Sequence, residues 1–130
     1  MKNQYHILLL EDEPLLRGML ALTLAAQGWQ VLTAGSLEDG ESVLRAMGWE
    51  WPDLVLSDAN LSRDPELLDG YIFHARWRVR FPIPPFVFLH GHTHLIRLPG
   101  EDSCVVRHVS KPFIPSELMA LICAILGTEE

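Results

Sequence analysis

The sequence predicts an α/β domain in which parallel β-strands alternate with α-helices. Short apolar runs, typical of strands that are buried on both faces, recur along the whole chain. Between them lie stretches whose apolar residues have helical spacing, and Gly and Pro separate the two kinds of segment. This alternation is typical of βα units, which build a parallel sheet covered by helices on both faces.

Five strands are predicted from these apolar runs. They span residues 5–10, 30–34, 53–57, 86–89 and 105–109. Runs of this length that are bounded by turn-forming residues indicate strands more than helices. Between the last two strands no helical face runs through residues 92–102, so we expect a short or displaced helix there.

Four helices are predicted from their boundary signals. Pro14 suits the first turn of the first helix, and Gly28 follows its end. Ser36 is the expected N-cap of the second, with acidic residues next to it that suit the positive end of a helix. A third helix is expected over residues 70–80, before a proline-rich segment, and Pro115 opens the last.

Composition narrows the range of functions. The chain has 130 residues, 48% of them hydrophobic and 21% charged, which predicts one globular domain. A net charge of −7 argues against nucleic-acid binding by this domain. No apolar run is long enough for a membrane span and no signal peptide is recognisable, so we expect no membrane contact and a cytoplasmic location. Cys104 and Cys123 lie in apolar stretches and are predicted to be buried thiols in a reducing compartment.

Three carboxylates and one lysine stand where predicted strands end. Glu11 and Asp12 follow the first strand, Asp58 follows the third, and Lys111 follows the fifth. The carboxyl ends of parallel strands meet at one edge of a sheet, where open α/β sheets place their sites. Clustered carboxylates repel one another, and Mg²⁺ would relieve that repulsion. A lysine beside the metal suits a phosphoryl group. The pattern therefore predicts phosphate chemistry on a carboxylate.

These segments resemble the receiver domain of bacterial two-component response regulators. The matching segments are residues 7–14, residues 52–58, Asp69-Gly70 and residues 110–113. The resemblance implies a single (βα)5 doubly wound, flavodoxin-like domain over residues 1–130, with a five-stranded parallel sheet in the order 2-1-3-4-5. No output domain is expected within these residues.

The resemblance also implies roles for individual residues. Asp58 would accept a phosphoryl group from a phosphohistidine or a small phosphodonor, and Lys111 would contact the phosphoryl oxygens. Asp12 and Asp58 would bind Mg²⁺ directly, Glu11 through a water, and Asn60 through its backbone carbonyl. Positioning and charge neutralisation are most of what an in-line phosphoryl transfer requires.

Three features depart from the family pattern. His90 stands where receivers have the Thr or Ser that contacts the phosphoryl group. His108 stands where the aromatic switch residue, Tyr or Phe, is expected. The loop between Asp58 and Gly70 is also longer than usual. The predicted phosphorylation site therefore matches the family pattern. The residues at the two switch positions, His90 and His108, do not.

The expected partners are a sensor histidine kinase or phosphotransfer protein upstream, and a downstream protein or the chain's own output domain. In the family the output surface uses the fourth and fifth helices and the fifth strand, often in a homodimer. The expected role is that of a signalling switch and not of an enzyme, although self-phosphorylation from small donors and autodephosphorylation are compatible with it.

Two other functions fit parts of the sequence. One is a pseudo-receiver, an interaction module that keeps the fold but signals without phosphorylation, and His90 and His108 favour it. The other is a metal-dependent phosphoesterase-like hydrolase. His90, His92 and His94 alternate as metal ligands on one face can, but the remaining motifs of such hydrolases are missing. His90 and His108 also suggest a further hypothesis, that protonation of either one near neutral pH biases the switch.

Overall fold

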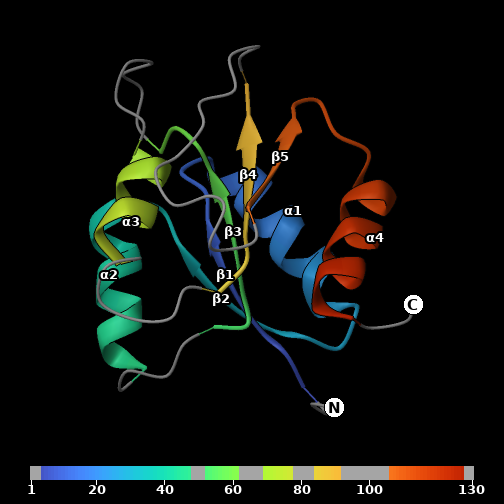
Figure 1. Cartoon of the computed structure of the whole chain (residues 1–130), viewed down its shortest axis with the longest axis horizontal. Helices are drawn as coiled ribbons and strands as arrows, with labels where there is room; N and C mark the ends of the chain where they lie inside the picture. Colours follow the sequence, from blue (N-terminus) through green and yellow to red (C-terminus); the bar gives the residue numbers. More distant parts are fainter. Residues whose placement is uncertain (1–3, 48–51, 62–68, 78–83, 92–105, 128–130) are drawn as a thin grey trace.

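The structure, a computed structural model, describes residues 4–47, 52–61, 69–77, 84–91 and 106–127. Five parallel strands form one sheet in the order β2-β1-β3-β4-β5 (Figure 1). This confirms the predicted fold class and strand order. The crossovers bring the carboxyl ends of all five strands to one edge of the sheet.

The five strands lie close to their predicted positions. They are β1 (His6–Leu10), β2 (Gln30–Ala34), β3 (Leu54–Asp58), β4 (Phe86–His90) and β5 (Val106–Ser110). One boundary matters for the site, because Asp58 is the last residue of β3 and not the first residue after it. Asp58 pairs with Leu89 of β4, and the next amide, that of Ala59, donates to the Leu89 carbonyl at 2.9 Å. The ladder therefore fixes the backbone at Asp58.

The helices begin where their sequence signals predict. They are α1 (Pro14–Ala25), α2 (Leu37–Ala46), α3 (Asp69–Trp77) and α4 (Pro115–Leu126). Ser36 caps α2 by accepting a hydrogen bond from the Asp39 amide at 3.1 Å, as expected. Gly28 after α1 has φ 90°, a conformation that favours glycine. Residues 92–102, where a short or displaced helix is expected, lie outside the described residues.

The helices cover the sheet from both sides, as Figure 1 shows with α2 and α3 on one face and α1 and α4 on the other. The alternation of side chains along each strand supplies two separate apolar cores. Leu8, Leu10 and Phe73 belong to the core under α2 and α3, while Leu9 and Ile122 belong to the core under α1 and α4. The sheet is thus a rigid base for the residues at its carboxyl edge.

Among the described residues, no helix is long and apolar enough to cross a membrane. Cys123 is buried in α4, as predicted, whereas Cys104 lies outside the described residues.

Candidate functional site

The three predicted carboxylates come together at the carboxyl edge of the sheet. One carboxylate oxygen from each of Glu11, Asp12 and Asp58 lies within 4.8 Å of the others. Glu11 and Asp58 are buried and Asp12 is half-buried. Adjacent central strands therefore deliver a compact set of oxygen ligands, as the sequence predicts.

Lys111 reaches into this cluster from the end of β5. Its Nζ donates a hydrogen bond to Oδ2 of Asp58 at 2.8 Å and lies 3.6 Å from Oε1 of Glu11. Its backbone amide donates to the carbonyl of His90 at 2.6 Å. Both ends of the residue are thus held, and the ammonium group partly neutralises two of the three carboxylates.

The turn after β1 is organised around Glu11. Oε2 of Glu11 accepts a hydrogen bond from the Glu13 amide at 3.2 Å, and the Glu13 side chain in turn accepts from the Leu15 amide at the start of α1. The backbone carbonyl of Glu11 accepts from Nη1 of Arg17 at 2.9 Å. Helix α1 therefore stabilises the turn that carries Glu11 and Asp12.

Burial and charge shift the pKa of two groups in the site. Desolvation, followed by the nearby charge of Asp58, raises the pKa of Glu11 from 4.5 to about 7. Burial acts to lower the pKa of Lys111, but its hydrogen bond to Asp58 and the charges of Asp58 and Glu11 outweigh that effect. The pKa of Lys111 is therefore raised above its ordinary value of 10.5. Glu11 is therefore buried and crowded enough to hold a proton near neutral pH.

The donor set fits Mg²⁺. Oε1 of Glu11 is buried and accepts no hydrogen bond within the described part of the chain. This oxygen is therefore available to a metal ion. Carboxylate oxygens are the ligands that Mg²⁺ prefers, and the ion commonly uses one or two carboxylates together with waters. Asn60, the fourth predicted ligand, is half-buried two residues beyond Asp58.

Gly70 is required by the tight packing beneath Asp58. A Cβ atom at this position would lie 2.1 Å from the Asp58 carbonyl oxygen and 2.9 Å from Oγ of Ser57. The Gly70 amide donates to the Ala59 carbonyl at 3.1 Å, which ties the start of α3 to the end of β3. A glycine here lets the helix approach the backbone of the site closely.

His90 and His108, two of the three predicted departures from the family pattern, are hydrogen-bonded to each other. Nε2 of His90 lies 2.7 Å from Nδ1 of His108, and the ring centroids are 4.9 Å apart. Their strands pair Phe88 with His108, so the two histidines are diagonal neighbours on one face of the sheet. One ring donates and the other accepts. His90 is buried, and His108 is half-buried and stacks on Phe88 at 5.8 Å.

Three residues of this region make contacts that the sequence did not predict. Arg17 and Gly70 act on the backbone of the site. The buried His74 of α3 packs edge-on against Phe86 at 4.7 Å in the aromatic row that leads to His108. Arg17 was detectable as a cation one turn into the helix after the acidic pair. The His90–His108 contact was not detectable from the sequence, because the register between β4 and β5 decides it.

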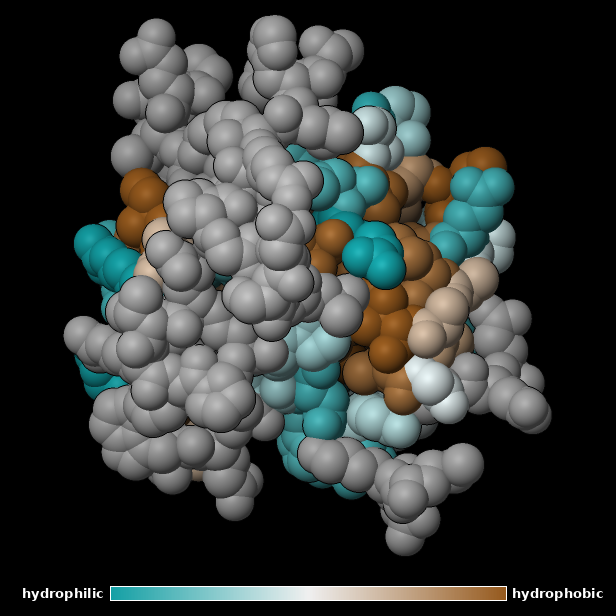
Figure 2. Space-filling model, viewed as in Figure 1, coloured by the Kyte–Doolittle hydropathy of each residue, from teal (hydrophilic) through white to brown (hydrophobic). Residues whose placement is uncertain are grey.

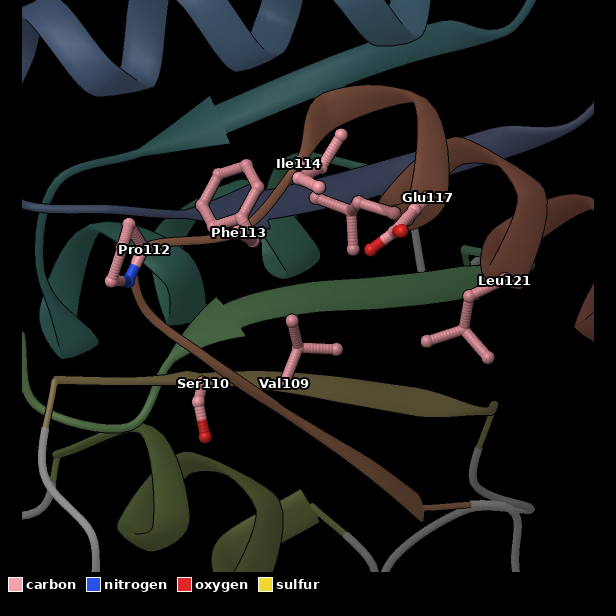
Figure 3. A pocket seen from close by; sticks show the side chains of 8 residues that line it. Val109, Ser110, Pro112, Phe113, Ile114, Glu117 and Leu121 are labelled. Carbon is pink, nitrogen blue, oxygen red and sulfur yellow. The ribbon is translucent and has the colours of Figure 1, made fainter.

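An apolar pocket of about 330 Å³ lies beside the site, between the end of β5 and the start of α4 (Figure 3). Its lining includes Val109, Phe113 and Leu121, with Glu117 as the charged residue. None of the three clustered carboxylates lines it. The pocket is therefore separate from the acidic cluster, although it adjoins Lys111 through Ser110 and Pro112.

His92 and His94 lie outside the described residues, so the hydrolase hypothesis rests on sequence alone. Among the described residues, the acidic cluster is the one group of three or more metal-ligating side chains that share a site. His90 is not part of that group, since its ring binds His108.

Comparison with known proteins agrees with this geometry. The family profile of the response regulator receiver domain matches residues 7–123. The chain belongs to this family, and relatives in it are response regulators of two-component signalling.

The relatives are longer than this chain. It is 32% identical over 128 residues to the probable transcriptional regulator ycf27 of Cyanophora paradoxa, covering 98% of this chain and 51% of that protein. It is 31% identical over 121 residues to the phosphate regulon transcriptional regulatory protein PhoB of Escherichia coli, covering 92% of this chain and 51% of that protein. The chain thus spans about half the length of these relatives.

Solved structures show the same fold. The N-terminal domain of a response regulator/sensory box/GGDEF 3-domain protein from Carboxydothermus hydrogenoformans superposes with a TM-score of 0.74 at 26% identity, with 94% of each chain covered. A response regulator receiver domain protein from Clostridium thermocellum gives a TM-score of 0.74 at 21% identity, covering 95% of this chain and 94% of that one.

Proposed function

We propose that this chain is a phospho-accepting receiver domain in which Asp58 takes up a phosphoryl group and changes a protein-binding surface. One observation carries the proposal. Asp58 ends the central strand β3 with its carboxylate 2.8 Å from Nζ of Lys111 and within 4.8 Å of ligand oxygens of Glu11 and Asp12. A nucleophilic carboxylate, a cation and a set of hard ligands thus converge.

The residues support an in-line transfer. An oxygen of Asp58 would form the new bond to phosphorus as the bond from phosphorus to the donor's leaving atom breaks, and the leaving group would keep that electron pair. Lys111 would neutralise charge on the phosphoryl oxygens. Bound Mg²⁺, held by Glu11, Asp12, Asp58 and the Asn60 carbonyl, would supply further charge neutralisation for those oxygens.

The ends of the strands would favour this transfer mainly by holding the reacting groups in position. Asp58 is fixed by the β3–β4 ladder and by the close approach of Gly70, while Lys111 is fixed through its amide at the His90 carbonyl. Groups that are already held in position lower the entropic part of the activation free energy. Positioning is the main requirement of this reaction, because the protein needs to supply little covalent chemistry.

The proposed partners are a sensor histidine kinase or phosphotransfer protein and a downstream protein, an output domain or a second copy of the chain. Apolar side chains exposed on α1 and before α4 support a protein partner, notably Leu15, Leu22 and Ile114 at 83%, 75% and 55% exposure. Figure 2 shows apolar residues gathered on the side of the molecule where α4 lies. The transcriptional relatives favour a downstream output domain.

A pseudo-receiver is the second candidate, and the His90–His108 hydrogen bond favours it. At 2.7 Å the His90 Nε2 is already bound by its neighbouring ring, whereas a switch residue must reach the phosphoryl group. In that case the fold and pocket would present a constitutive interaction surface.

Intact mass spectrometry after incubation with acetyl phosphate and Mg²⁺ distinguishes the two functions. We expect a gain of one phosphoryl group that disappears in Asp58→Asn and in EDTA. Absence of the adduct in a folded protein that binds Mg²⁺ would contradict the proposal and favour the pseudo-receiver.

A further inference from the structure

Arg17 lies at the acidic rim without belonging to the ligand set. It is on the second turn of α1, and its Nη1 donates to the backbone carbonyl of Glu11 at 2.9 Å. The Glu11 amide donates to the Ala34 carbonyl at 3.0 Å, which is the last link of the β1–β2 ladder. Glu11 is the first residue after β1, and Arg17 donates the hydrogen bond that its carbonyl accepts.

The guanidinium lies in a space that Gly35 leaves open. A Cβ atom at residue 35 would lie 2.8 Å from Nη1 of Arg17, 3.7 Å from its Cζ and 3.9 Å from the Glu11 carbonyl oxygen. Gly35 joins β2 to α2. Arg17 therefore bridges the turn after β1 and the turn after β2, with one hydrogen bond and one close packing contact.

We propose that Arg17 is a positioning residue for the magnesium site. From the space beside Gly35 it holds the Glu11 carbonyl and so fixes the turn that presents Glu11 and Asp12. This inference rests on the proposed function, because it concerns the same ligand set. Groups that orient ligands commonly alter metal affinity by about tenfold or more when they are removed.

The test compares Mg²⁺ affinity, by isothermal titration calorimetry at fixed ionic strength, in two variants that act differently. Arg17→Met removes the donor and its charge. Gly35→Ala removes nothing, but its methyl group displaces the flexible end of Arg17 and leaves the charge in place. We expect both to weaken Mg²⁺ binding by about tenfold.

Arg45→Met is the matched control. Arg45 is exposed in the last turn of α2, which runs back toward the opposite edge of the sheet, so the variant removes one positive charge far from the rim. We expect its Mg²⁺ affinity to match that of the unmodified protein. Circular dichroism and urea unfolding establish that all variants fold.

Amide hydrogen exchange in EDTA gives a readout that needs no metal. The amides of Asp12 and Glu13 should exchange faster in Arg17→Met and in Gly35→Ala, and at an unchanged rate in Arg45→Met. This measurement reports on the turn itself.

Each outcome decides the inference. Because removal of a positive charge by itself favours binding of a cation, weaker binding in Arg17→Met supports the positioning role whether or not Gly35→Ala shares it. Stronger or unchanged binding in Arg17→Met, or equal weakening in Arg45→Met, would overturn that role. If the unmodified protein bound no Mg²⁺, the metal part of the proposed function would fall together with this inference. Loss of phosphorylation with normal Mg²⁺ affinities would overturn the proposed function alone.

Discussion

His90 and His108 share a hydrogen bond of 2.7 Å between Nε2 and Nδ1, at the two residue positions that the sequence predicts to differ from the family pattern. The departures are therefore one structural unit and not two separate substitutions. His90 is buried, so the hydrogen bond to His108 satisfies a buried ring nitrogen.

Replacing one histidine should cost more than replacing both. In His108→Phe the ring that stacks on Phe88 is kept, but Nε2 of His90 loses its partner, which should lower the free energy of unfolding by about 1–3 kcal/mol. His90→Leu with His108→Phe removes both polar groups. Urea unfolding of the two single variants and the double variant measures the coupling. Strictly additive losses would show that the bond contributes nothing to stability.

The stability of the metal-free protein should fall as pH rises because of Glu11. Its pKa is about 7 in the folded protein and near 4.5 when unfolded, so the folded state retains a proton that the unfolded state has released between these values. The protonated Glu11 therefore stabilises the fold fully below pH 4.5, and this contribution, on the order of 3 kcal/mol, is lost as pH rises through 7.

Urea unfolding in EDTA from pH 4.5 to 8 measures this effect, with Glu11→Gln as the control that lacks the titrating group. As pH increases, the free energy of unfolding of Glu11→Gln should rise relative to that of the unmodified protein. A constant difference between the two proteins across this range would contradict the shifted pKa.

Lys111→Met should slow phosphorylation of Asp58 and leave the fold in place. The variant removes the ammonium group 2.8 Å from Asp58, and loss of one preorganised charge contact typically slows such a reaction by about 100-fold. It should also raise the pKa of Glu11 further, since Lys111 acts to lower it. Initial rates of adduct formation with acetyl phosphate, read by intact mass, test this at saturating Mg²⁺. A rate equal to that of the unmodified protein would exclude Lys111 from the reaction.

Gly70→Ala should destabilise the protein strongly. The added methyl group would lie 2.1 Å from the Asp58 carbonyl oxygen, a backbone atom, so β3 or α3 must shift. We expect a loss of about 3 kcal/mol in the free energy of unfolding. Gly18→Ala in α1 is the matched control, because nothing lies within 4 Å of its Cβ position and the change should add about 0.5–1 kcal/mol. Equal effects at the two positions would contradict the packing argument.

The sequence predicted the fold and the acidic cluster because both depend on local signals. Apolar runs and helix boundaries located the strands, and strand ends in a parallel sheet meet at one edge, so Glu11, Asp58 and Lys111 had to converge. The contacts of Arg17 and Gly70 were not predicted. They depend on how closely a helix approaches a particular carbonyl, which spacing along the chain does not encode.

The histidine pair shows a different limit. The register between β4 and β5 decides that His90 and His108 are diagonal neighbours, and register is a tertiary property. The resemblance identifies both positions but does not predict the contact between them. Their hydrogen bond required the paired strands.

The way in which His90 is bound also constrains how the sequence can change. Its ring binds His108 while its carbonyl accepts a hydrogen bond from the Lys111 amide, so one residue joins Lys111 to the neighbouring position on β5. An exchange of either histidine alone removes this hydrogen bond from a ring nitrogen of the other. Mutational paths between this pair and the hydroxyl and aromatic residues of other receivers therefore pass through a less stable single mutant, and related sequences should retain or replace both histidines together.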